Sequence, residues 1–193
     1  MNSISELFIK YHLLQHPFYL AWNEGKLTRE QLALYACEYG SFISLISQGW
    51  EQIGQQDIAK EEIAHYALWK NFAGSVGGDR IGDNLPAVKQ LVRETKLHYS
   101  TYASALGALF AFEAQQPATA TSKLNGLRTH YSQWNADETY FKVHENDLTE
   151  PAMLEEKIKM LNASDYAIAE SACAATCKSL WDALSGVMDA KLN

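Results

Sequence analysis

Hydrophobic residues recur at intervals of three and four along nearly the whole chain, and strict alternation of apolar β-branched and polar positions is absent. The first spacing gathers apolar side chains on one face of an α-helix, whereas alternation is typical of strands. The pattern therefore predicts an all-α protein. The 193 residues are enough for one well-buried core, and no linker, repeat or low-complexity stretch divides them. We expect a single domain over residues 1–193.

Capping residues, glycines and prolines predict where the helices begin and end. Thr28 followed by Gln31 is a capping box, so a long helix is expected from Thr28 to about Ile53. Pro86 suits the first turn of a later helix, and Ser164 is expected to cap the closing helix. The remaining helices are expected over residues 3–14, from Pro17 to the glycine at 25, and over residues 57–74, 88–97, 99–116, 121–134, 137–147 and 164–191.

Charge and hydropathy exclude two classes of partner. The formal net charge is −7, and the 16 Lys and Arg residues are scattered, so no basic surface is expected for nucleic acid. The N-terminal stretch carries charge inside its apolar part and has no small-residue cleavage site, unlike a signal peptide. The longest uncharged apolar run is too short to span a membrane. We expect a cytoplasmic protein that does not bind membranes.

Cys37, Cys173 and Cys177 cannot all pair within one chain, and a domain of this size does not need a disulfide for stability. Reduced, buried thiols are the expected state. Cys173 and Cys177 lie one helical turn apart, which also suits metal chelation or a redox pair. No second cysteine pair or adjacent histidine supports that alternative.

Ionisable residues on apolar helix faces are the most informative, because burial of an unpaired carboxylate costs several kcal/mol. Glu113 is the only charged residue of the very apolar segment 99–116. It is either a buried metal ligand or general base, or a partly exposed residue near a helix end. The sequence around Glu113 leaves both interpretations open.

Two further groups have the spacing of metal ligands. Glu62 and His65 form a Glu-x-x-His pair, which places a carboxylate and an imidazole on one helix face where both can reach one ion. His144 and Asp147 have the same spacing, with Glu150 close behind. An exposed helix face produces the same patterns. Taken together, carboxylates and imidazoles from three helices are the ligand inventory of a non-haem iron site.

Several segments resemble the heme-oxygenase-like superfamily. HPFYLAWNEGKLTREQLALYACEYGSF is similar to the early segment of its TenA/PqqC-like proteins. GALFAFEAQQP, YFKVH and SLWDALSGV resemble the branch of heme-oxygenase-like di-iron oxidases that contains the chlamydial protein associating with death domains. The resemblance implies a bundle of about seven helices, often dimeric, and a non-haem iron oxidase that acts on a small organic metabolite with O2.

The resemblance also implies particular ligands. Glu62, His65 and Glu113 match the family's ligand positions, and His144 matches the first residue of its last motif, His-x3-Asp-x2-His. The other two positions of that motif fall on Leu148 and Pro151, which cannot bind a metal. A one-residue deletion would instead bring Asp147 and Glu150 into the motif, with loss of its last histidine.

The predicted site is therefore as follows. Glu113 is the expected catalytic residue, and the expected ligands of one or two iron ions, or of manganese, are Glu62, His65, Glu113, His144 and Asp147. A substrate pocket is expected beside Tyr35, Tyr39 and Phe42, whose shared face is also explained by packing alone. In a 4-aminobenzoate-forming member, a tyrosine and a lysine of the protein itself would be reactants. The ten tyrosines do not reveal which one.

Four rival functions belong to the same fold. Loss of the last ligand motif would leave a metal-free ligand-binding bundle or a cofactorless PqqC-like oxidase. A haem-degrading enzyme needs a proximal histidine near the N-terminus, for which His12 and His16 are the candidates. A thiaminase-type TenA enzyme needs a cysteine on the buried helix, and the segment 99–116 has none. The partners expected are a small-molecule substrate, O2 and a second copy of the chain.

Overall fold

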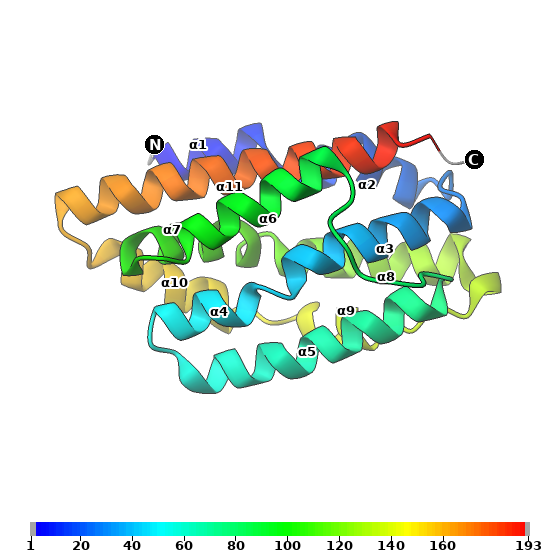
Figure 1. Cartoon of the computed structure of the whole chain (residues 1–193), viewed down its shortest axis with the longest axis horizontal. Coiled ribbons are helices and arrows are strands. Elements are labelled where there is room, and N and C mark those ends of the chain that lie inside the picture. Colours follow the sequence, from blue (N-terminus) through cyan, green and yellow to red (C-terminus); the bar gives the residue numbers. More distant parts are fainter. Residues whose placement is uncertain (1–2, 192–193) are drawn as a thin grey trace.

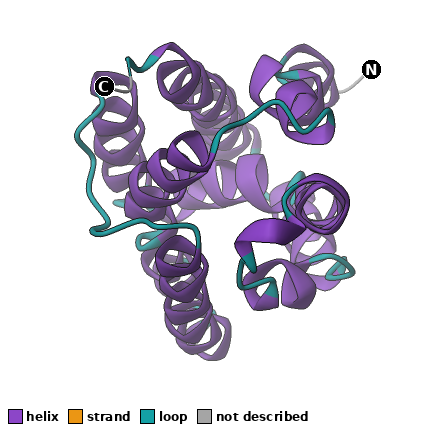
Figure 2. Ribbon diagram, turned by 90° about the vertical axis from the view of Figure 1, so that its right-hand side faces the viewer, coloured by secondary structure: helices purple, strands orange, loops and turns teal. Residues whose placement is uncertain are grey.

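The structure is a computed structural model that describes residues 3–191, and within that range it contains helices and no strand, which confirms the all-α prediction. Most helices run along the long axis of the molecule (Figure 1), so the view turned by 90° looks nearly down several of them (Figure 2). The helices are α1 (Ser3–Lys10), η1 (Leu13–Gln15), α2 (Pro17–Asn23), α3 (Arg29–Ile43), α4 (Ile46–Gln52), α5 (Gln56–Ser75), α6 (Pro86–His98), α7 (Tyr102–Glu113), α8 (Gln116–His130), η2 (Ser132–Trp134), α9 (Thr139–His144), α10 (Thr149–Lys159) and α11 (Ala163–Asp189).

Helix α7 lies at the centre of the core, since every residue from Ala103 to Glu113 is buried. It packs most extensively against α11, and also against α10 and α4. A Cβ atom at Gly107 would lie 1.9 Å from the backbone oxygen of Ala169, so only glycine allows α7 and α11 to approach this closely. The buried helix that carries Glu113 is therefore held firmly by its neighbours.

The helix expected from Thr28 to Ile53 is wrong as a single element. The capping box at Thr28 and Gln31 is present, but α3 ends at Ile43 and α4 begins at Ile46. The Ser44 hydroxyl donates a hydrogen bond to the Ser41 carbonyl oxygen, and such back-bonding bends helices. The break lets α4 pack against both α5 and α7.

Several other boundaries differ from the prediction, and two of them have a local cause. Helix α8 begins at Gln116 rather than Thr121, because Pro117 is accepted in its first turn. Helix α11 is capped by Asn162 rather than Ser164, and the Asn162 side chain accepts a hydrogen bond of 3.0 Å from the Asp165 backbone N–H. In both cases a residue just outside the apolar periodic stretch sets the boundary.

The break between α3 and α4 and the short helices α9 and α10 determine where the polar centre lies. Helix α5 packs against α9, and α10 packs against α7. Glu62 of α5, the C-terminal end of α7 and the segment from α9 to α10 thus surround one buried region. Among the described residues, no helix is long and apolar enough to cross a membrane.

Candidate metal centre

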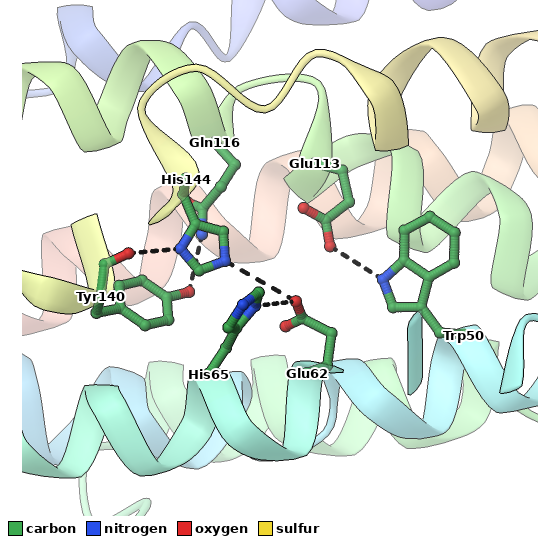
Figure 3. Close-up of polar contacts among 7 residues, drawn as sticks. All are labelled: Trp50, Glu62, His65, Glu113, Gln116, Tyr140 and His144. Carbon is green, nitrogen blue, oxygen red and sulfur yellow. Dashed lines mark hydrogen bonds and ion pairs between the residues drawn. The ribbon is translucent and has the colours of Figure 1, made fainter. Parts of the chain in front are cut away.

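Glu62 and His65 of α5 converge with His144, the last residue of α9. One potential ligand atom from each of these residues lies within 4.8 Å of the other two. Figure 3 shows Glu62 and His65 pointing from α5 toward His144, while Glu113 approaches from α7. Glu62 and His144 are each 3% exposed. The structure therefore brings together three of the five predicted ligands in one tight group.

The hydrogen bonds orient these side chains as in a metal site. Nδ1 of His65 lies 2.7 Å from Oε1 of Glu62. Nδ1 of His144 lies 2.6 Å from the backbone oxygen of Tyr140, and because a carbonyl oxygen only accepts, this nitrogen carries the proton. In the neutral ring Nε2 then keeps its lone pair, and it lies 3.8 Å from Oε1 of Glu62. Metal-binding histidines commonly donate their other ring N–H to a carbonyl oxygen in this way.

The electrostatics of Glu62 and His65 agree with this arrangement. Burial opposes ionisation of Glu62, but hydrogen bonds with His144 and His65 hold the pKa of its carboxyl below the ordinary value. The hydrogen bond to Glu62 in turn raises the pKa of His65. Glu62 is therefore a carboxylate at neutral pH and is available to a cation.

Glu113 is buried at the C-terminal end of α7, with 2% of its surface exposed. Glu113 is therefore buried, as expected of a ligand or general base, and the alternative of a partly exposed residue is wrong. The Trp50 indole N–H donates a hydrogen bond of 3.4 Å to Oε1 of Glu113. Burial, followed by repulsion from Glu150 and Glu62, raises the pKa of Glu113 well above the ordinary value. Glu113 lies outside the group of ligand atoms within 4.8 Å.

The segment after α9 places its two acidic residues differently. Asp147 is half-buried, and its Oδ1 accepts a hydrogen bond of 3.0 Å from the Thr149 backbone N–H. Glu150, in the first turn of α10, is only 7% exposed. Burial and repulsion from Glu62 raise the pKa of Glu150 to about 8. The predicted ligand set did not include Glu150. Its spacing from His144 in the sequence was the signal that could have identified it.

Oxygen and imidazole donors of this kind suit iron or manganese. Glu62, Glu113 and Glu150 are all buried, and within residues 3–191 none of them forms an ion pair with a lysine or arginine. A divalent cation would supply the missing positive charge. The residues present therefore fit the metal that the sequence predicts.

The predicted pocket residues Tyr35, Tyr39 and Phe42 are buried in the aromatic core. The ring centroids of Tyr35 and Tyr39 lie 5.3 Å apart, and those of Tyr39 and Phe42 lie 5.5 Å apart. The Tyr35 side chain is buried, and burial followed by repulsion from Tyr19 raises the pKa of its hydroxyl well above the ordinary value. These contacts place the three side chains against one another, and a role in substrate binding stays a prediction.

A buried lysine is the functional candidate that the sequence interpretation missed. Lys123 of α8 is 3% exposed, and burial lowers the pKa of its amine from 10.5 to about 7. Its Nζ lies 5.1 Å from the ring centroid of Tyr19, 5.9 Å from that of Tyr35 and 5.5 Å from that of Phe141. We call these four residues the lysine chamber. The available signal was that Lys123 shares a helix face with apolar Ala120 and Leu127.

The two N-terminal histidines differ in their contacts. Both ring nitrogens of His16 are engaged, because Nδ1 accepts from the Phe18 backbone N–H at 3.0 Å and Nε2 lies 2.9 Å from the Ser185 hydroxyl. His16 is thus the N-cap of α2 and a buried anchor to α11, which leaves no nitrogen for a haem iron. The Nδ1 of His12 is buried without a hydrogen-bond partner. The three cysteines are free thiols, with Cys173 and Cys177 buried as expected.

Comparisons with known proteins agree with this site. A family model described as an iron-containing redox enzyme matches residues 12–146. A 4-aminobenzoate synthase of Nitrosomonas europaea is 34% identical, with 96% of this chain and 89% of the relative covered.

A solved domain of unknown function with a heme oxygenase-like fold, from Shewanella denitrificans, superposes with a TM-score of 0.75 at 16% identity. The superposition covers 96% of this chain and 89% of the solved chain. A TenA homologue of Pseudomonas syringae gives a TM-score of 0.73 at 12% identity, with 96% and 92% covered. The resemblance and the heme-oxygenase-like fold stated from the sequence are confirmed.

Proposed function

Because this chain belongs to the family of iron-containing redox enzymes, we propose that it forms 4-aminobenzoate and that Lys123 and Tyr19 are its protein-derived reactants. The observation that carries the proposal is the lysine chamber, in which a buried amine, with no ion pair among residues 3–191, faces tyrosine rings. The 4-aminobenzoate synthase of Nitrosomonas europaea, which is 34% identical, supports the same activity.

The metal would be held by Glu62, His65 and His144, with Glu113 beside them. Bound iron would supply the redox chemistry with O2 that amino-acid side chains lack. The burial of Glu62, Glu113 and His144 keeps water away from this centre. Asp147 stays a predicted ligand. Its side chain also accepts a hydrogen bond from the backbone N–H of Thr149 in the turn before α10.

Lys123 has the chemistry expected of a nitrogen donor. A lysine amine attacks carbon only in its neutral form, and burial lowers the pKa of Lys123 to about 7. Much of the amine is therefore unprotonated near neutral pH. An ordinary exposed lysine is almost fully protonated under the same conditions.

Tyr19 is the best-placed ring donor. 4-Aminobenzoate is a benzene ring with its two substituents at opposite positions, and the tyrosine side chain has the same pattern. The lysine nitrogen, released from its own side-chain carbon, would replace the phenolic oxygen, and Cβ would become the carboxylate carbon with cleavage of its bond to Cα and with O2 as oxidant. Among the two tyrosine rings near Nζ of Lys123, that of Tyr19 is nearer, at 5.1 Å against 5.9 Å for Tyr35. Because both reactants belong to the chain, each chain forms at most one product molecule.

Aromatic rings connect the lysine chamber to the metal centre. The ring centroids of Tyr35 and Trp69 lie 5.7 Å apart, those of Trp69 and Tyr140 lie 4.8 Å apart, and those of Tyr140 and His144 lie 4.3 Å apart. Oxidising equivalents that arise at the metal would therefore have a short route to the tyrosines through packed aromatic side chains.

The experiment uses full-length protein grown with ¹⁵N-lysine, loaded anaerobically with Fe(II) or Mn(II) and then exposed to O2. We expect up to one ¹⁵N-labelled 4-aminobenzoate per chain by mass spectrometry, and none from Lys123→Arg or Tyr19→Phe. Lys89→Arg changes an exposed lysine and is the matched control. Unlabelled product, or an undiminished yield from Lys123→Arg, would refute the role of Lys123.

We further propose that residues 1–193 form one domain in the cytoplasm, as the composition predicts, and that the chain is a homodimer, as the family resemblance implies. Light scattering coupled to size exclusion measures the mass directly. A mass near twice 21.6 kDa supports the dimer, and 21.6 kDa contradicts it.

A further inference from the structure

The end of the ligand motif is where this chain departs from its family. Four and seven residues after His144 stand Leu148 and Pro151, which have no ligand atom in their side chains. The match to the family model ends at residue 146, before these positions. A second ion would therefore need a ligand that this chain supplies in its own way.

Glu150 is the side chain that the fold places there. It lies in the first turn of α10, which packs against the buried helix α7. Only 7% of the surface of Glu150 is exposed, and no hydrogen bond or ion pair to it is found among the described residues. A buried carboxylate without a partner is costly, so a native site is expected to compensate it.

The surroundings of Glu150 contain carboxylates and a histidine rather than lysine or arginine. Repulsion from Glu62 and Asp147 acts on Glu150, and repulsion from Glu150 acts in turn on Glu113. These four carboxylates would carry four negative charges when ionised. Two divalent cations would neutralise them, whereas one would leave two charges uncompensated in a buried region.

We propose that Glu150 replaces the missing family histidine as a metal ligand and, with Glu113 and Asp147, forms a second, oxygen-rich ion site. This inference deepens the proposed function and rests on the metal centre of that proposal. Oxygen donors without histidine suit Mn(II) as well as Fe(II), so the second site accepts either ion.

The second site would be separate from the group formed by Glu62, His65 and His144. Glu113 and Glu150 lie outside the group of ligand atoms within 4.8 Å of one another. Carboxylates that repel each other stay apart until a cation is present. Binding of the second ion would therefore have to bring the carboxylates of Glu113 and Glu150 together.

The test compares wild type with Glu150→Gln and Glu150→His, loaded anaerobically with Fe(II) or Mn(II), desalted and measured by elemental analysis. Glu156→Gln, on an exposed face of α10, is the matched control. We expect two ions per chain for wild type, Glu150→His and the control, and one for Glu150→Gln. Two ions retained in Glu150→Gln, or one ion in wild type, would overturn the proposal.

A second readout separates ligation from a purely structural role. Because the second ion would lose a ligand, Glu150→Gln should reduce the rise in melting temperature that Mn(II) causes. A lower melting temperature with an unchanged metal-induced rise would mean that Glu150 only supports the packing of α10, and would reject ligation.

These outcomes are independent of product formation. If wild type binds two ions through Glu150 but forms no 4-aminobenzoate, the proposed function fails and the second ion site stands. If Glu150→Gln keeps two ions and wild type forms 4-aminobenzoate, the second ion site as assigned fails and the proposed function stands.

Discussion

The metal centre and the lysine chamber are two buried ionisable regions with opposite charge. The metal centre gathers Glu62, Glu113 and Glu150, of which Glu62 is hydrogen-bonded to histidine. The lysine chamber holds one amine, that of Lys123, among the rings of Tyr19, Tyr35 and Phe141. Within residues 3–191, no lysine or arginine forms an ion pair with the three glutamates, and no carboxylate forms one with Lys123.

The two regions meet the cost of burial in different ways. Lys123 can release its proton, because burial lowers the pKa of the amine to about 7. Glu62 keeps its charge, because His65 and His144 hold the pKa of its carboxyl below the ordinary value. An isolated buried group can become neutral, whereas a carboxylate stabilised by two histidines, as Glu62 is, stays charged and is suited to bind a cation.

Replacement of Glu62 should have the largest effect. Glu62→Gln keeps the size and a hydrogen-bonding oxygen but removes the charge at the centre of the ligand group. We expect metal affinity to fall more than the roughly 10–100-fold seen when only the hydrogen-bond partners of metal ligands are changed. Elemental analysis after desalting measures the loss, and Glu61→Gln, an exposed neighbour, is the control. Full metal content in Glu62→Gln would show that the ion lies elsewhere.

Replacement of Lys123 tests the other region through stability. The pKa of this amine is about 7 in the folded chain, against 10.5 for an ordinary lysine, so between these values the unfolded chain binds the proton and the folded chain does not. Stability therefore rises with pH across that window, by up to about 1.4 kcal/mol per pH unit. The penalty is complete below pH 7 and corresponds to ~5 kcal/mol. We expect Lys123→Met to be more stable at pH 7 and to lose this slope.

Urea unfolding at pH 7, 8 and 9 measures the slope, with Lys89→Met as the exposed control. Tyr19 and Tyr35 are the titratable groups whose rings lie near the amine. Burial raises the pKa of both phenols, so in the folded state they stay neutral in this range. An unchanged slope in Lys123→Met would mean that Lys123 stays charged in the folded state.

Replacement of Tyr140, which lies between the two regions, should have the smallest effect. Tyr140→Phe removes the hydroxyl that accepts a 2.8 Å hydrogen bond from Nε2 of Gln116, and keeps the ring against His144 and Trp69. We expect a loss of about 1 kcal/mol in unfolding free energy and unchanged metal content. Loss of metal from this variant would show that the hydroxyl, and not only the ring, supports the metal centre.

Local signals in the sequence predicted the helices but did not predict every interruption between them. The capping box at Thr28 and Gln31 is present, because a cap depends on residues three apart. The interruption after Ile43 was missed, since it depends on the Ser44 hydroxyl and on the packing of α4 against α5 and α7. Apolar spacing alone continues smoothly across that point.

The sequence by itself determined the all-α class and identified Glu113 and the Glu62–His65 pair as candidates, because each depends on composition or spacing within one or two helical turns. Only the tertiary structure decided that His144 meets this pair, that Glu150 is buried beside it and that Lys123 faces tyrosine rings. These residues come from helices far apart in the chain, and their meeting depends on how the helices pack.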